Sequence, residues 1–222
     1  MGNIWSEHFR YYDLFQKNSD KYLKTIEFHL RKLKKSKRIL DTGAGSGNLA
    51  LAFLRNGHLL TAVDSNKLAL NILKDKCMDF KDKLMVKEMD VQNLDFDDEQ
   101  FDGASSMFVI PFVKDNKKYF SKIFRVLKEG GVLVISAWAP VEDSLNGLMN
   151  PLEEELTKKE ILPKYKKEWN LIKESGEVLV KTVLEGPDIN GIINILEGVG
   201  FKNIKNHENP YGKYAYFITC EK

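Results

Sequence analysis

Residues 39–47 have the sequence Ile-Leu-Asp-Thr-Gly-Ala-Gly-Ser-Gly, a short apolar run that leads into a loop with three glycines. The run from Arg38 to Asp41 is predicted to be a β-strand, and the helical spacing of apolar residues after the loop predicts a helix that ends near Gly57. Glycines in such a loop bring backbone N–H groups and the helix N-terminus close to a ligand, because they have no Cβ. This stretch therefore predicts a ligand-binding strand, loop and helix.

The spacing of the glycines narrows the class of ligand. Gly43 and Gly45 fit the first and third positions of the dinucleotide fingerprint, but its sixth position is occupied by Asn48. The third glycine is Gly47, which gives the pattern G-x-G-x-G and argues against an NAD-dependent oxidoreductase. The Gly-Lys-Ser/Thr ending of a phosphate-binding P-loop is also absent after Gly47.

The alternation of strand and helix continues after this first unit. Further strands are predicted at residues 59–64, 84–90, 101–107 and 132–138, and helices at 66–78 and 114–128. Gly130 and Gly131 are expected to stop the second of these helices. Strands that alternate with helices through short connections are typical of a parallel sheet with helices on its faces.

Three segments lie outside this alternation. Two helices are predicted between residues 6 and 35, with a break near residues 18–20. Residues 139–186 are predicted to be helical and charged. After them the sequence predicts a helix at 188–199 and two strands, 201–207 and 213–220, joined by a tight turn and therefore antiparallel.

Composition excludes several classes of protein. The 222 residues include 34 basic and 32 acidic side chains, so the chain lacks the strong single-signed charge that favours nucleic acids or anionic membranes. No apolar run approaches the roughly 18 residues of a membrane span. The two cysteines, Cys77 and Cys220, cannot form a disulfide framework or a metal site alone, and they fit a reducing compartment, the cytoplasm. The acidic run at residues 95–99 lacks the spacing of a metal site, and no metal is expected.

Two features near the N-terminus remain open. Gly2 followed by Ser6 matches the loose pattern for N-myristoylation, but the pattern is short and a chance match is the favoured interpretation. His8 is considered as a general base, with a structural or exposed histidine as the alternative.

The motifs in register along the chain resemble those of class I S-adenosylmethionine-dependent methyltransferases. Residues 39–47 resemble the first motif of that family, with an acidic residue two positions before G-x-G-x-G. Val63-Asp64 and Met89-Asp90-Val91 resemble its second and third motifs. Residues 124–134, with Phe101-Asp102 before them and 196–201 after, resemble the small-molecule branch typified by quinone-biosynthesis methyltransferases.

The resemblance implies an α/β fold: a Rossmann-like, doubly wound, seven-stranded and mostly parallel sheet with an antiparallel last strand. N-terminal helices and a helical lid inserted between strands 5 and 6 complete it. We expect a single methyltransferase domain, 1–222, divided into an N-terminal helical cover (1–37), a cofactor-binding core (38–138), a helical insertion (139–186) and a C-terminal helix and hairpin (187–222).

The implied cofactor is S-adenosyl-L-methionine, which leaves as S-adenosyl-L-homocysteine. Asp64 is expected to bind the ribose hydroxyls, Asp90 and Val91 the adenine, and Asp41 the amino group. The alternatives are a helix N-cap for Asp64, a turn for Asp90 and a loop cap for Asp41. The full set of expected cofactor residues is Asp41, Gly43, Ala44, Gly45, Gly47, Asp64, Ser65, Asp90, Val91, Met107 and Tyr12. A methionine that the family usually carries against adenine is replaced by Ala69.

The acceptor pocket is expected to be apolar and small. Its expected residues are Tyr11, Phe108, Phe112, Trp138, Met149 and Trp169, the last two with a purely anchoring role as the alternative. No residue is assigned as a catalytic acid or base, so methyl transfer to a small, partly apolar acceptor would depend on proximity. The alternatives are a methyltransferase directed at protein or RNA, and a cofactor-binding protein without catalysis. A monomer or a homodimer is expected.

Overall fold

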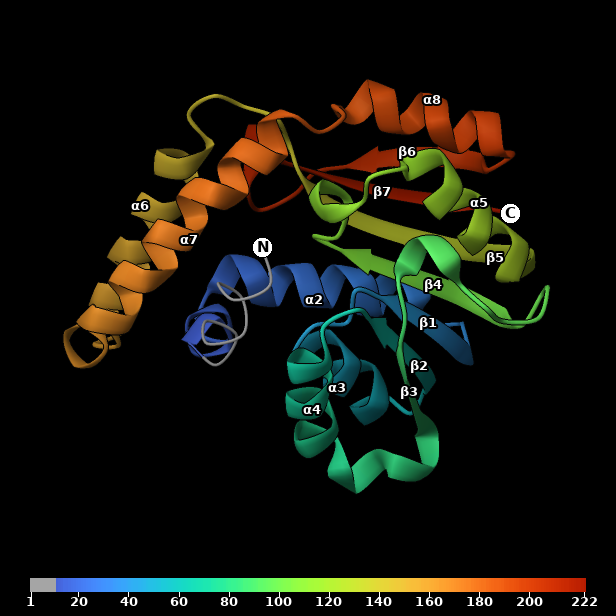
Figure 1. Cartoon of the computed structure of the whole chain (residues 1–222), viewed down its shortest axis with the longest axis horizontal. Coiled ribbons are helices and arrows are strands. Elements are labelled where there is room, and N and C mark those ends of the chain that lie inside the picture. Colours follow the sequence, from blue (N-terminus) through green and yellow to red (C-terminus); the bar gives the residue numbers. More distant parts are fainter. Residues whose placement is uncertain (1–10) are drawn as a thin grey trace.

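The computed structural model describes residues 11–222, and its centre is a seven-stranded sheet with the strand order β3-β2-β1-β4-β5-β7-β6 (Figure 1). The strands are β1 (Arg38–Thr42), β2 (Leu59–Asp64), β3 (Leu84–Glu88), β4 (Phe101–Met107), β5 (Leu127–Trp138), β6 (Lys202–His207) and β7 (Ala215–Glu221). The first five are mutually parallel, and β7 runs antiparallel to both β5 and β6. The predicted Rossmann-like α/β sheet with its antiparallel last strand is confirmed.

Helices cover both faces of the sheet. They are α2 (Asp20–Leu33), α3 (Asn48–Arg55), α4 (Lys67–Lys76), α5 (Asn116–Val126), α6 (Ser144–Lys158), α7 (Lys166–Leu184) and α8 (Ile189–Val199). Short 3-10 turns are η1 (Met78–Lys83), η2 (Val91–Asn93), η3 (Ile110–Phe112), η4 (Leu162–Lys164) and η5 (Gly212–Tyr214). Ile39 packs with α2, α3 and α4 on one face, whereas its neighbour Leu40 packs with α5 and α8 on the other. Successive side chains of a strand point to opposite faces, so both residues are buried.

Side chains and glycines at the helix ends set several of these boundaries. Asn66, Asp115 and Asp188 precede α4, α5 and α8, and each side chain accepts a hydrogen bond from a backbone N–H in the first turn, at 3.1, 2.8 and 2.8 Å. Gly200 ends α8 with φ +114°, which glycine adopts without steric cost. The sequence therefore supplies a cap at the start of α4, α5 and α8 and at the end of α8.

The fourth helix-to-strand connection differs from its prediction. We expected a helix over residues 114–128 and a strand from Val132, but α5 ends at Val126 and β5 already begins at Leu127. Leu127 pairs with Phe101 at the start of β4, and the register shifts before Gly103 pairs with Val132. Gly130 and Gly131 therefore lie within an irregular strand and do not act as a helix stop.

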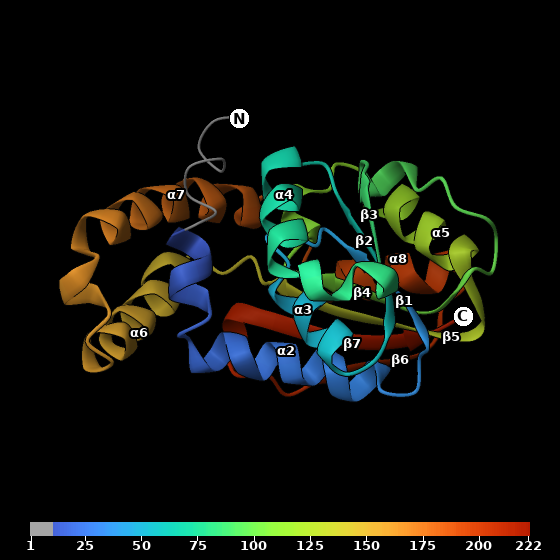
Figure 2. The same ribbon diagram turned by 90° about the horizontal axis from the view of Figure 1, so that it is seen from below.

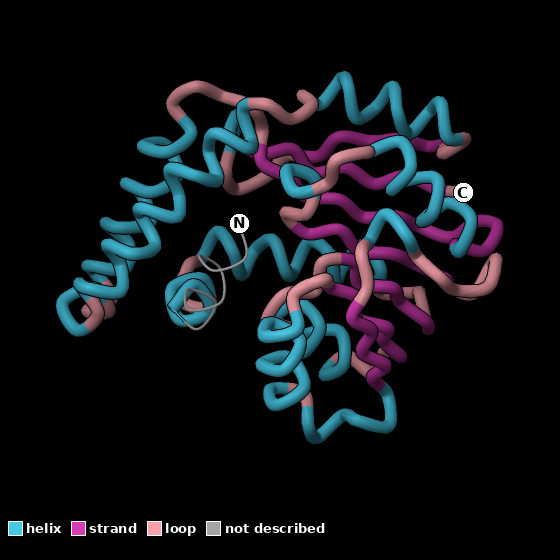
Figure 3. Tube along the Cα trace, viewed as in Figure 1, coloured by secondary structure: helices cyan, strands magenta, loops and turns pink. Residues whose placement is uncertain are grey.

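Residues 139–186, which we call the insertion, project beyond one end of the sheet as α6, η4 and α7 (Figures 2 and 3). Their core consists of Leu156, Leu162, Trp169 and Ile172, packed around Phe15. Phe15 belongs to a helical segment at residues 11–16. The Gly2 and Ser6 pattern and His8 lie outside the described residues.

Both cysteines of the chain, Cys77 and Cys220, are free and buried. In the described part of the chain, no helix is both long and apolar enough to cross a membrane. Over the same residues no group of three or more His, Cys, Asp or Glu side chains is placed to hold a metal ion.

Candidate active site

A cavity of about 330 Å³ lies at the edge of the sheet where the parallel strands β1, β2 and β4 end. In an open α/β sheet this edge is where ligands bind, and small-molecule sites occupy roughly 300–1,000 Å³. All the expected cofactor residues except Asp41 line the cavity: Tyr12, Gly43, Ala44, Gly45, Gly47, Asp64, Ser65, Asp90, Val91 and Met107. The fold thus gathers residues from four separate connections and from the N-terminal segment.

Residues 43–47, the glycine loop, form one wall of this cavity. A Cβ on Gly43 would lie 2.5 Å from Val109 Cγ2, and a Cβ on Gly47 would lie 2.6 Å from Leu73 Cγ. The position of a Cβ on Gly45 meets no described atom within 4 Å. Packing alone accounts for Gly43 and Gly47, whereas Gly45 borders the open space of the cavity.

Asp64, at the end of β2, binds the glycine loop directly. Its Oδ2 accepts a hydrogen bond from the backbone N–H of Gly45 at 2.9 Å, and its Oδ1 accepts from that of Asn66 at 2.8 Å. Burial raises the pKa of the Asp64 carboxyl, and these backbone hydrogen bonds oppose the rise. The N-cap of α4 is Asn66, so Asp64 does not have that alternative role. Each carboxylate oxygen retains a lone pair that can accept from a ligand hydroxyl.

Asp90 forms the turn after β3. Its Oδ1 accepts a hydrogen bond from the backbone N–H of Gln92 at 2.8 Å, so the side chain caps η2 as the turn alternative predicts. The carboxylate is exposed and also lines the cavity, beside Val91 and Gln92. The second oxygen, Oδ2, accepts longer hydrogen bonds from Gln92 Nε2 at 3.3 Å and from Asn93 Nδ2 at 3.5 Å, and a ligand amino group would compete with these two side chains for it.

Asp41 lies behind the glycine loop and is buried. Its Oδ2 has no hydrogen-bond partner among the described residues, and burial raises the pKa of the carboxyl to about 7 despite a hydrogen bond from Ser105. Ser105 Oγ lies 2.9 Å from His29 Nδ1, and His29 Nε2 lies 3.0 Å from Ser136 Oγ. Ser105 thus lies between Asp41 and His29, and His29 in turn joins Ser105 to Ser136. Burial lowers the pKa of His29 to about 3, so this chain of hydrogen bonds contains a neutral imidazole.

Two aromatic rings that line the cavity, Phe108 and Trp138, are stacked on each other and contact a third ring, Tyr211, that is not part of its lining. The rings of Phe108 and Trp138 are stacked, with centroids 4.0 Å apart and planes 10° from parallel. Tyr211 meets both edge-on, at 5.8 Å from Phe108 and 4.9 Å from Trp138. Phe108 adopts φ +59°, an uncommon value for a residue other than glycine. Phe112 also lines the cavity and is 51% exposed.

A second, smaller cavity of about 90 Å³ lies among the helical segment 11–16, α6 and α7. Tyr12, Trp138 and Leu179 line both cavities, so the two share a wall. Met149 lines only the smaller one.

Two expected acceptor residues line neither cavity. Tyr11 packs against the core of the insertion, and Trp169 is buried within that core. The ring of Trp169 meets Phe15 edge-on with centroids 5.1 Å apart. Trp169 thus has the anchoring position that was its alternative.

The cavity also includes residues that the sequence reasoning did not single out. Tyr22 comes from α2, Asn48 directly follows the glycine loop, and Leu179 comes from α7. The position of Asn48 next to Gly47 was a usable signal, since the first helical residue after such a loop faces the ligand. Tyr22 and Leu179 lie far from any motif, and only the tertiary fold brings them to the site.

Comparison with known proteins identifies relatives of this chain. Residues 40–135 match a family described as a methyltransferase domain. A relative from Vibrio parahaemolyticus, the ubiquinone/menaquinone biosynthesis C-methyltransferase UbiE, is 30% identical over 185 residues, which are 80% of this chain and 69% of the relative.

Solved structures share the fold. A SAM-dependent methyltransferase from Thermotoga maritima has a TM-score of 0.64 at 16% identity and covers 100% of both chains. A SAM-dependent methyltransferase from Aquifex aeolicus has a TM-score of 0.61 at 16% identity, with 94% of this chain and 96% of that chain covered.

Proposed function

Because this chain belongs to the class I S-adenosylmethionine-dependent methyltransferases, we propose that its methyl acceptor is a small, partly apolar molecule. S-adenosylmethionine is its cofactor, and methyl transfer is its activity. The observation that carries the acceptor proposal is that the aromatic side chains of Phe108, Trp138 and Phe112 line the same cavity as the glycine loop. A macromolecular substrate needs a broad polar groove, whereas this site is concave and largely apolar.

The cofactor residues are proposed from the hydrogen-bonding groups that line the cavity or lie behind it. Asp64 would accept from the ribose hydroxyls through its remaining lone pairs, and Asp90 and Val91 would hold the adenine. The methionine portion would lie along Gly45, where the structure leaves open space. The free Oδ2 of Asp41 would accept, directly or through a water, from the amino group.

When bound, S-adenosylmethionine supplies a methyl group activated by the positive charge on sulfur. The protein's contribution is then to align the acceptor and exclude water, and alignment alone can supply roughly 7–11 kcal/mol. Phe108 and Trp138 offer flat faces on which a planar acceptor can stack. No side chain is proposed as a general base, so the acceptor's own pKa would govern its reactivity.

Two further points extend the proposal. The Vibrio relative is named for ubiquinone and menaquinone biosynthesis, which supports a small ring compound as the acceptor. We also propose a reducing compartment, the cytoplasm, because Cys77 and Cys220 are both free and buried.

The test has two steps. Calorimetric titration with S-adenosylhomocysteine, beside NADH, should give heat only with the first. Transfer of a radioactive methyl group is then measured to a panel of phenols, quinols and amines, and to total protein and RNA. Small acceptors should be labelled, and the labelling should fall in Trp138→Ala. Labelling of protein or RNA alone, or binding without any transfer, would overturn the proposed acceptor.

A further inference from the structure

The helical segment 11–16 joins the cofactor side of the molecule to the insertion. Tyr12 lines both cavities, Asp13 contacts the glycine loop, and Phe15 lies in the core of the insertion. The segment is only about one and a half helical turns long, so these three side chains contact different parts of the site from neighbouring positions on one short helix.

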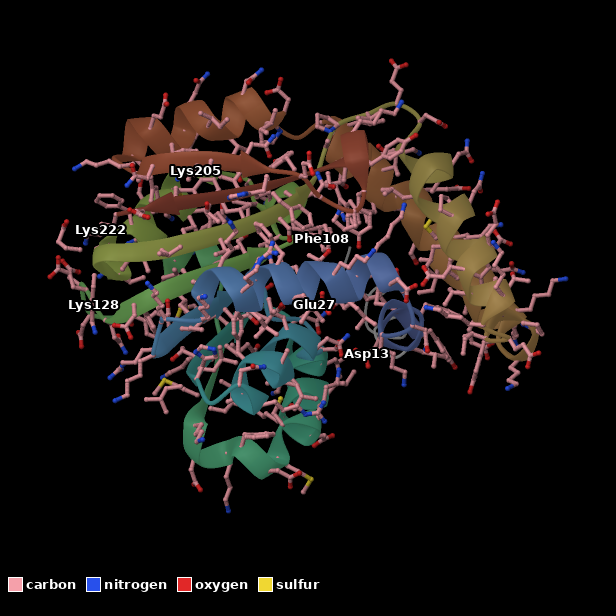
Figure 4. The ribbon with its side chains drawn as sticks, turned by 180° about the vertical axis from the view of Figure 1, so that it is seen from behind. Asp13, Glu27, Phe108, Lys128, Lys205 and Lys222 are labelled. Atoms are coloured by element: carbon pink, nitrogen blue, oxygen red, sulfur yellow. The ribbon has the colours of Figure 1, made fainter. Side chains whose placement is uncertain are left out.

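Asp13 makes the contact with the cofactor side. Its Oδ1 accepts from Ser46 Oγ at 2.8 Å and from Lys76 Nζ at 2.7 Å. Lys76 Nζ also donates to Asn48 Oδ1 at 2.7 Å. Asp13 thus links the glycine loop, the start of α3 and the end of α4, and Figure 4 shows it between the helical segment and these elements.

The Asp13 and Lys76 side chains are shielded from water. They are only 17% and 18% exposed, unlike ion pairs at an open surface, which contribute little. Two donors share one carboxylate oxygen, and one of them is charged, so the contact is a strong one. It also places a negative charge beside Tyr12. Burial first and Asp13 second raise the pKa of Tyr12 to about 12, so its hydroxyl stays protonated.

The other side of the segment is fixed to the insertion. Phe15 is 1% exposed and packs against Trp169. Just beyond the segment, Lys159 Nζ at the end of α6 donates to Asn18 O and to Asp20 Oδ1, both at 2.7 Å. The segment and the insertion are therefore packed together as one body. Asp13 is the polar connection between that body and the glycine loop.

We propose that Asp13 is a positioning residue that couples the cofactor loop to the helical insertion. A glycine loop ordered by cofactor holds Asp13 through Ser46, and Asp13 in turn holds the segment and the insertion over the acceptor side of the cavity. Without this contact the segment moves with the insertion and the cofactor site opens. The inference rests on the cofactor assignment but not on the identity of the acceptor.

The test measures the dissociation rate of S-adenosylhomocysteine and hydrogen exchange with and without it. In Asp13→Ala and in Lys76→Met we expect dissociation to be about tenfold faster, the size expected for one lost charge-assisted hydrogen bond. In the wild type the ligand should protect the amides of residues 43–49 and also those of α6 and α7. In the variants protection should remain in the loop and disappear from the insertion.

Matched variants separate coupling from damage to the fold. Lys74→Met removes the same charge from an exposed position on α4 and should behave as wild type. Lys76→Arg should restore the slow dissociation, because it restores the cation. Dissociation within twofold of wild type in both Asp13→Ala and Lys76→Met, or unchanged protection of α6 and α7, would overturn the coupling. Absence of ligand binding to the wild type would overturn the cofactor assignment instead, so the two failures are distinguishable.

Discussion

The carboxylate of Asp64 and the backbone N–H of Gly45 are joined by a hydrogen bond of 2.9 Å, although 19 residues separate them in the sequence. The carboxylate proposed to bind the ribose therefore also fixes the glycine loop. Any change to Asp64 is expected to act on both parts of the cofactor site at once.

Asp64→Ala should weaken binding of S-adenosylhomocysteine by at least tenfold, because it removes a charged acceptor worth roughly 1.5–3 kcal/mol. Asp64→Asn keeps an oxygen for only one of the two backbone N–H groups that Asp64 holds, those of Gly45 and Asn66, and its NH2 group meets the other. It should therefore retain more affinity than Asp64→Ala but lose thermal stability relative to wild type. Isothermal titration and thermal unfolding of both variants check this. Equal affinity of Asp64→Ala and wild type would contradict the assigned role.

Gly45→Ala and Gly47→Ala should have different effects. The added methyl of Gly47→Ala meets Leu73, so we expect a loss of about 2–4 kcal/mol in the free energy of unfolding from overpacking and backbone strain. Gly45→Ala adds only the strain of φ +52°, about 1 kcal/mol, but its methyl enters the cavity and should weaken cofactor binding. Urea unfolding and ligand titration separate the two quantities. If the two variants lost stability and ligand affinity to the same extent, the different roles of Gly45 and Gly47 would be contradicted.

Trp138→Ala should affect the acceptor more than the cofactor. Loss of the ring removes the stack with Phe108 and the wall shared by the two cavities. We expect kcat/KM for the acceptor to fall about tenfold or more, because an aromatic contact contributes ~0.5–1.5 kcal/mol beyond its buried area. The Kd of S-adenosylhomocysteine should change less than threefold. Trp138→Phe serves as the control and should recover part of the activity.

The buried pair Asp41 and His29 makes opposite contributions to the pH dependence of stability. The pKa of Asp41 rises from 3.8 to about 7 on folding, so its contribution falls as the pH increases through that interval. The pKa of His29 falls from 6.5 to about 3, so its contribution rises with pH between about 3 and 6.5. The two slopes oppose each other between about pH 4 and 6.5.

Asp41→Asn removes only the contribution of Asp41, which lowers the free energy of unfolding as the pH increases. Relative to wild type, its free energy of unfolding should increase by roughly 2–4 kcal/mol between pH 4 and pH 7. Urea unfolding of both proteins at intervals of half a pH unit measures the difference. A difference that does not change with pH would show that the carboxyl of Asp41 does not titrate in this range.

Local signals were sufficient for much of the fold. Leu59–Asp64 was predicted with the bounds it has, because an apolar run between Gly57 and an acidic end admits few alternatives. Leu127 was assigned to a helix, since its partner in the sheet, Phe101, lies in another strand and the local sequence continues a helical spacing. Strand pairing at an irregularity depends on tertiary contacts that a local pattern does not contain.

The candidate site, like the fold, has residues that local sequence patterns identified and residues that they did not. Gly45, Asp64 and Asp90 lie at or just after the ends of strands and were singled out from motifs, because the ends of parallel strands meet at one edge of the sheet. Asp13 and Leu179 come from helices outside the motifs, and nothing in their local sequence distinguishes them from other helical residues. The residues at the strand ends that line the larger cavity were therefore predictable, and so was a helical insertion over residues 139–186. The single residues through which the N-terminal segment and the insertion reach the glycine loop and the cavity were not.

The insertion leaves and rejoins the sheet at neighbouring points. Residues 139–141, where it begins, and Asp188 and Ile189, just after it ends, line the same surface hollow, and the backbone N–H of Ala139 donates to Tyr214 O at 2.9 Å beside β7. A segment with adjacent ends can change in length or sequence without altering the strand order around it. The geometry thus makes residues 139–186, together with the segment that carries Phe15 into their core, an exchangeable module, through which one cofactor-binding core could acquire different acceptors during evolution or by grafting in the laboratory.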